Sequence, residues 1–169
     1  MKKILLGLLA LGLTIPASAQ IIKTEELSEV VVYATNYKYL HNVNTEEVAS
    51  VPVELLERKV AAFNVKDSEY YQDDWGVYNI NFYIPDGRIL AAYDSDGKLL
   101  RTAERFKDIN LPMAVKKAVL NRFPEWTITK DVYLVNYHED KGVTKKYKLK
   151  LENGDETIRV KVDEKGEFL

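Results

Sequence analysis

Few residues of this chain have the type and spacing that chemistry requires. Residues 94–97, Asp-Ser-Asp-Gly, resemble the start of a calcium-binding loop. Such a loop continues with further oxygen ligands and ends in a bidentate glutamate, but Leu99, Leu100 and Arg101 follow here. The segment therefore predicts a hairpin turn with glycine at positive φ. Its recurrence as residues 163–166, with a lysine replacing an acid, favours the same interpretation.

The histidines and the acidic pairs are the remaining candidates for a catalytic or metal site. Zinc needs three or four converging ligands, and neither His41 nor His138 has a second ligand at suitable spacing, so both are predicted to be solvent-exposed. The absence of cysteine excludes thiol catalysis and cysteine-ligated metals. No nucleophile elbow, phosphate-cradling glycine loop or HExxH motif occurs. The acidic pairs, at residues 25–26 and 73–74, fall in a tail and a turn. The sequence therefore predicts a non-enzyme with no cofactor and no metal.

The amino terminus predicts export. Two lysines, an apolar run over residues 4–13 and the small residues 17–19 form a signal peptide with cleavage after Ala19. The apolar run is far short of the ~20 residues of a membrane span. Gln20 stands where a lipoprotein would need cysteine, so no stable membrane anchor is expected and the predicted location is periplasmic or secreted. A formal charge of −2 gives no support for a nucleic-acid partner.

A helical signature occurs twice, and the elements of the chain are organised around it. Residues 51–63 recur as residues 111–123, so that Pro52 matches Pro112 and Phe63 matches Phe123. A proline in the first turn suits a helix start, and apolar residues follow at helical spacing in both copies. Ser50 and Asn110 precede the two copies as candidate capping residues.

Each predicted helix is followed by strands with alternating apolar and polar residues. The sequence predicts an α+β fold of two tandem units, each a helix followed by an antiparallel meander of three or four strands, sharing one core. The predicted boundaries are a signal peptide (1–19), a leader with one possible strand at 29–33 and a tyrosine-rich added strand or arm (20–49), a first unit (50–106) and a second unit (107–169).

This pattern resembles the PepSY-like proteins, also described as β-lactamase-inhibitor-like. The resemblance covers about residues 50–169. It depends on the following residues: Pro52, Phe63, Asp94 and Gly97 in the first unit, and Pro112, Phe123, Pro124, Asp163 and Gly166 in the second. It implies an exported, non-catalytic module, and inhibitor-type relatives hold a partner protein on the open face of the sheet. The family pattern contains no catalytic residues.

The predicted sheet face turned away from the helices is the one candidate binding surface. It presents Asn79, Asn81, Tyr83 and Leu90 from the first unit and Lys146, Lys148, Lys150, Arg159 and Lys161 from the second. An ordinary solvated face, with lysines that prevent edge pairing, accounts for this pattern. A docking surface for an envelope or secreted protein, or for an anionic polymer, is the functional alternative. A structural or stress-related envelope protein without a ligand, and an enzyme with an unrecognised site, are the other hypotheses.

Overall fold

The computed structural model describes residues 36–44 and 51–169, which form three helices and six strands. The predicted signal peptide, its cleavage site, the possible strand at 29–33 and Ser50 lie outside the described residues. The helices are α2 (Tyr37–Val43), α3 (Val51–Ala62) and α4 (Met113–Arg122). The strands are β1 (Val77–Ile84), β2 (Gly87–Asp94), β3 (Leu99–Lys107), β4 (Thr127–His138), β5 (Gly142–Asn153) and β6 (Glu156–Asp163). The predicted α+β class is therefore confirmed.

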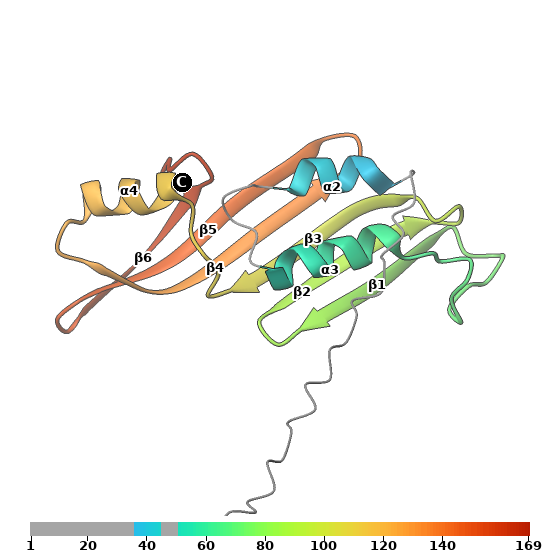
Figure 1. Cartoon of the computed structure of the whole chain (residues 1–169), viewed down its shortest axis with the longest axis horizontal. Helices are drawn as coiled ribbons and strands as arrows, with labels where there is room; N and C mark the ends of the chain where they lie inside the picture. Colours follow the sequence, from blue (N-terminus) through green and yellow to red (C-terminus); the bar gives the residue numbers. More distant parts are fainter. Residues whose placement is uncertain (1–35, 45–50) are drawn as a thin grey trace, which may run out of the picture.

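The six strands form one antiparallel sheet whose spatial order equals their order in the chain. β3 pairs with the later part of β4, whereas β6 pairs with the later part of β5. Since β4 and β5 run antiparallel, these contacts fall toward opposite ends of the two long central strands. The sheet is consequently staggered, with β1 and β6 at diagonally opposite edges (Figure 1).

The alternation along each strand sorts the side chains onto two faces. All three helices cover the same face (Figure 1), and the residues beneath them form a single buried cluster. Phe106, Tyr133 and Tyr147 lie opposite one another on β3, β4 and β5. Their rings stack at centroid distances of 6.3 and 4.9 Å, which continues the core across the junction of β3 and β4.

The two repeated helices form where the apolar spacing predicts them. Val53 and Val60 of α3, and Val115 and Val119 of α4, are buried on the sheet side. The predicted cap Asn110 is wrong, because α4 begins after Pro112 without a side-chain cap and the Asn110 side chain instead accepts a hydrogen bond from Lys116 Nζ at 3.0 Å. Within the described residues, no helix is long and apolar enough to cross a membrane.

Residues 37–43 correct the expectation of an added strand or arm, because they form helix α2. Tyr39 and Val43, four residues apart, place their side chains on one helical face and are buried in the core. The preceding Asn36 fixes this helix: its amide donates to the carbonyl oxygens of Ala61 and Gly97 and its oxygen accepts from Leu99 N. Tertiary contacts therefore override the strand propensity of the tyrosines.

Candidate functional site

The residues predicted to form a binding surface all lie on the sheet face opposite the helices. Asn79, Asn81 and Tyr83 alternate with core-facing residues along β1, and Tyr83 is 65% exposed. Lys146, Lys148, Lys150, Arg159 and Lys161 do the same on β5 and β6. The structure separates these two groups, because β2, β3 and β4 lie between them. The predicted surface is thus two patches at opposite edges of one face.

Five cationic side chains line a shallow hollow over β4, β5 and β6, which we call the basic hollow: Lys130, Lys148, Lys150, Arg159 and Lys161. Its volume is about 530 Å³. Lys130 was missed from sequence, because its place on this face depends on a register shift between Ile128 and Lys130. Lys146 lies on the same face of β5, before Lys148 in the chain and opposite Asp163.

The register of the sheet sets like charges directly opposite one another in the basic hollow. Lys148 pairs with Lys161, and Lys150 pairs with Arg159 on one side and with Lys130 on the other. Such pairs have Cβ atoms about 5 Å apart and destabilise a sheet. Within the described part of the chain, Lys150 is the one member of the five with an ion pair, to Glu152. The hollow is therefore a concentration of positive charge on a protein that is acidic as a whole.

The β1 side of the face is polar and aromatic. A second hollow of about 540 Å³ lies over β1 to β5 and includes Asn79, Leu90, Arg101, Asn136 and His138 in its lining. Its residues are less uniform in charge than those of the basic hollow. It offers amide and hydroxyl groups without a cluster of charge.

The turn at residues 94–97 is a hairpin turn, as predicted. Asp94 Oδ1 accepts hydrogen bonds from the backbone N–H groups of Asp96 and Lys98, both at 2.9 Å, and Gly97 has φ +81. Asp163 makes the equivalent bonds to Lys165 and Glu167 N–H. Each carboxylate is thus occupied by its own backbone. Among the described residues no group of three or more metal-ligating side chains could hold an ion.

The two histidines lie apart from any cluster of catalytic groups in the described chain. His41 is exposed on α2, as predicted. His138 is half-buried, which corrects the expectation of full exposure, and its Nδ1 accepts a hydrogen bond from Asp140 N at 3.3 Å. Its position at the end of β4, next to the hairpin turn, explains the partial cover.

The sequence interpretation missed a charged cluster beneath α2 and α3. Glu104 of β3 is fully inside the core, where its Oε1 accepts hydrogen bonds from Tyr39 Oη at 2.9 Å and Thr102 Oγ1 at 2.6 Å. Glu57 of α3 is 5% exposed and interacts with the Glu104 carboxyl. Lys145 of β5 is 6% exposed, and its positive charge balances part of the charge of the two carboxyls. Its Nζ lies 3.7 Å from Glu164 Oε2.

Burial shifts the pKa values in this buried cluster. It raises the pKa of Glu57 to about 9, with the neighbouring charge of Glu104 as the next cause. Burial also raises the pKa of Glu104, to about 7, although hydrogen bonds from Thr102 and Tyr39 oppose the shift. Burial lowers the pKa of Lys145. Burial and the neighbouring carboxyl therefore favour the protonated, neutral form of Glu57 in the folded protein.

A sequence signal for this cluster existed. Glu57 falls in the apolar stripe of α3, one residue after Leu56 and three before Val60. Lys145 precedes Tyr147 and Leu149 in the inward series of β5. A charged residue at an inward position of an apolar pattern predicts a buried charge, which must find a partner or change its protonation.

No protein-family model matches the chain, and no curated protein matches it. Among solved structures the chain is similar to a BLIP-like protein from Bacteroides fragilis, with 12% sequence identity and a TM-score of 0.33. The likeness covers 84% of this chain and 86% of the other. It is too low to support an argument about function, and membership of the PepSY-like family stays a prediction.

Proposed function

We propose that this protein is an exported, non-catalytic binding module that holds an anionic partner in the basic hollow. The observation that carries the proposal is the register of β5 and β6, which opposes Lys148 to Lys161 and Lys150 to Arg159. Each such pair costs the folded sheet a few tenths of a kcal/mol or more. An anionic group placed between the cations would remove that cost and add attraction.

The shape and chemistry of the basic hollow favour an extended anionic partner over a small one. Cations repeat about 7 Å apart along a strand and about 5 Å apart between strands, so several negative groups could be bound together. The hollow lies on the open sheet face, which none of the helices α2, α3 and α4 covers. An acidic protein surface and an anionic envelope polymer both meet this requirement.

The proposal also includes the predicted division into two units, the signal peptide and the location outside the cytoplasm. The order of helix and three strands, followed by helix and three strands, supports two tandem PepSY-like units at residues 50–106 and 107–169. The signal peptide and a periplasmic or secreted location complete the proposal. A partner outside the cytoplasm then has access to the open face.

Charge reversal tests the proposed function. We expect the purified protein to be retained on immobilised heparin, used as a probe polyanion, and to capture a partner from envelope extract. Lys148→Glu combined with Arg159→Glu should weaken heparin binding by at least about tenfold, about 1.4 kcal/mol. The matched control is Lys117→Glu with Lys165→Glu, which changes the net charge equally at exposed positions near α4.

The outcomes separate the hypotheses. Weak binding by the hollow variant alone supports the proposal. Equal weakening by both double variants would mean that only net charge matters, and the assignment to the basic hollow would be wrong. A wild-type protein that neither binds heparin nor captures a partner would favour the alternative, a structural or stress-related envelope protein without a specific ligand.

A further inference from the structure

Strand β1 is an edge strand without the usual protection against pairing. It lies at the end of the sheet order and, among the described residues, its strand partner is β2 alone. None of its residues, from Val77 to Ile84, is charged or a proline. The opposite edge differs: β6 carries Glu156, Arg159, Lys161 and Asp163, and Val162 also bridges to Phe168. Natural edge strands use such charges to prevent association.

The sequence of β1 is nearly palindromic about Ile80. The residues before it in reverse order are Asn79, Tyr78 and Val77, and the residues after it are Asn81, Phe82 and Tyr83. The matched residues are identical at 79 and 81 and both aromatic at 78 and 82, whereas 77 and 83 share only a preference for strands. A strand with this property can pair with an antiparallel copy of itself without a mismatch.

The faces of the sheet agree with that pairing. In an antiparallel pair, residues opposite one another point to the same face. Centring the pair on Ile80 sets Asn79 opposite Asn81 of the second copy on the open face. On the helix face it sets Tyr78 opposite Phe82 and Ile80 opposite itself. Tyr78, Ile80 and Phe82 are all buried or half-buried beside the helices, so both faces continue across the join.

We propose that β1 pairs with β1 of a second copy of this chain, forming a two-fold symmetric dimer with one continuous sheet. The two-fold axis is perpendicular to the sheet and passes midway between Ile80 of one copy and Ile80 of the other. Such an interface is isologous, because the same surface is used by both copies. The outward-facing backbone groups of β1 bond to the second copy, and the half-buried Ile80 and Phe82 lose their remaining contact with water.

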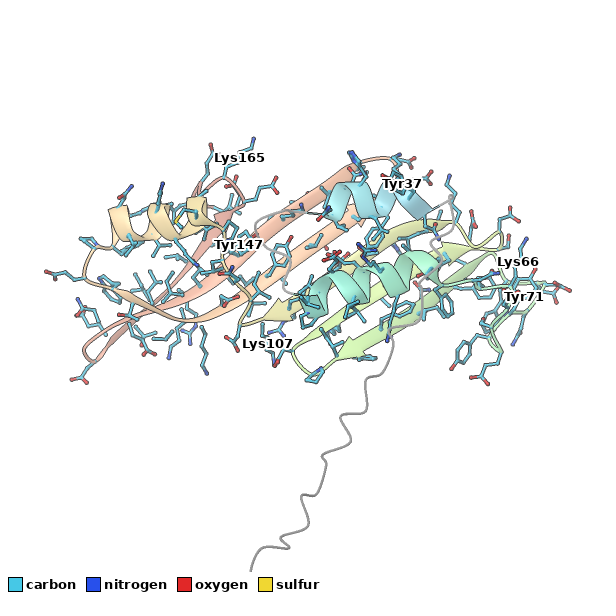
Figure 2. All side chains as sticks on the ribbon, in the orientation of Figure 1. Tyr37, Lys66, Tyr71, Lys107, Tyr147 and Lys165 are labelled. Atoms are coloured by element: carbon cyan, nitrogen blue, oxygen red, sulfur yellow. The ribbon has the colours of Figure 1, made fainter. Side chains whose placement is uncertain are left out.

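Aromatic residues next to β1 supply contact area beyond the strand itself. A hollow of about 520 Å³ runs beside the strand and is lined by Tyr70, Trp75 and the first residues of β1. Tyr70 and Trp75 are exposed, and the Trp75 ring lies 6.0 Å from that of Tyr78. Figure 2 shows the neighbouring Tyr71 in the loop that precedes β1, at one end of the molecule. A second copy on β1 would cover these rings.

The exposed asparagines allow a test that leaves the core intact. The measurement is the mass in solution, by sedimentation velocity over a range of micromolar concentrations. Asn79→Lys with Asn81→Lys places lysine opposite lysine at both symmetric positions, and it should raise the dimer dissociation constant by at least about tenfold. Asn79→Lys with Asn81→Glu places opposite charges there and should leave the dimer as stable as wild type or more so. Both variants change the same exposed sites.

Mixing supplies an independent check. The basic double variant (N79K/N81K) and its acidic counterpart (N79E/N81E) should each be monomeric alone and form a mixed dimer together, seen by native mass spectrometry.

A monomeric wild type would overturn the proposal. If its β1 amides were also protected from hydrogen exchange, residues 20–35 of the same chain would be the favoured occupant of the edge. Equal dimerisation of wild type and N79K/N81K would overturn it as well. K148E/R159E leaves the dimer unchanged, so failure here is distinct from failure of the proposed function.

Discussion

Replacing Glu57 with glutamine is expected to remove most of the pH dependence of stability above neutral pH. Glu57 keeps its proton in the folded protein up to a pKa of about 9, whereas an ordinary glutamate loses it near 4.5. Between these values the folded state holds more protons than the unfolded state. The free energy of unfolding therefore falls as the pH rises through this range.

The structure sets the size of the effect. Each proton retained on folding changes the free energy of unfolding by about 1.4 kcal/mol for each pH unit. Between about pH 6 and pH 8.5 the wild type should therefore lose roughly 3 kcal/mol through Glu57. Glu104, with its pKa raised to about 7, adds a decrease that continues through neutral pH and ends roughly one pH unit above it. Both carboxyls thus act in the same direction.

Glutamine has nearly the shape of protonated glutamate and is neutral at every pH. The variant should match the wild type to within about 1 kcal/mol near pH 6, because both side chains are then neutral. It should exceed the wild type by roughly 3 kcal/mol near pH 8.5. The residual slope of the variant below neutral pH reports Glu104.

The assay is urea unfolding at several pH values between 6 and 8.5, followed by circular dichroism. Glu54→Gln is the matched control, since Glu54 lies one turn earlier on α3 and forms an exposed pair with Arg58. That variant should keep the wild-type slope. Wild-type stability that is constant or rises over this pH range would refute the protonated state of Glu57. Equal slopes in the wild type and the Glu57 variant would refute its role as the source.

Two further substitutions test how the helices are held on the sheet. Gly166→Ala should destabilise the protein by about 1 to 3 kcal/mol, because Gly166 has φ +89 and an added Cβ would lie 2.9 Å from Ala114 O of α4. Gly154→Ala, at φ +56 in open space, should cost less in the same urea unfolding, and equal losses would contradict the contact with α4. Asn36→Ala should cost roughly 2 to 4 kcal/mol, since it removes three hydrogen bonds to the backbone around α2, α3 and β3. A loss below about 1 kcal/mol in thermal unfolding would show that α2 is held by apolar packing alone.

Most strands and two of the helices could be predicted from local patterns. The alternation from Tyr78 to Ile84 and from Tyr147 to Leu151 predicts strands with one solvent-exposed face and one buried face. Both strands are present in the structure. The repeated Asp-x-x-Gly turns could be predicted because an aspartate binds its own backbone at short range. Such interactions are visible within a few residues of sequence.

Helix α2 could not be predicted, because its tyrosines favour strands and its contacts are with residues far away in the sequence. Tyr39 bonds to Glu104 of β3, and the preceding Asn36 bonds to Ala61 and Leu99. The partners of Glu57 and Lys145 were hidden for the same reason. These groups are 47 and 41 residues from Glu104 along the chain. The register of β3, β4 and β5 brings Lys145 near Glu104, and the packing of α3 on the sheet adds Glu57.

The alternation of apolar and polar residues was enough to predict which side chains of each strand face water and which face the core, because a pleated strand alternates its side chains whatever its neighbours are. It thereby placed Lys148, Arg159 and Tyr83 on an open face. The tertiary structure decided which of them are neighbours, since that depends on strand order and register. It joined the cations of β4, β5 and β6 into one hollow and left Tyr83 at the far edge of the sheet, on strand β1.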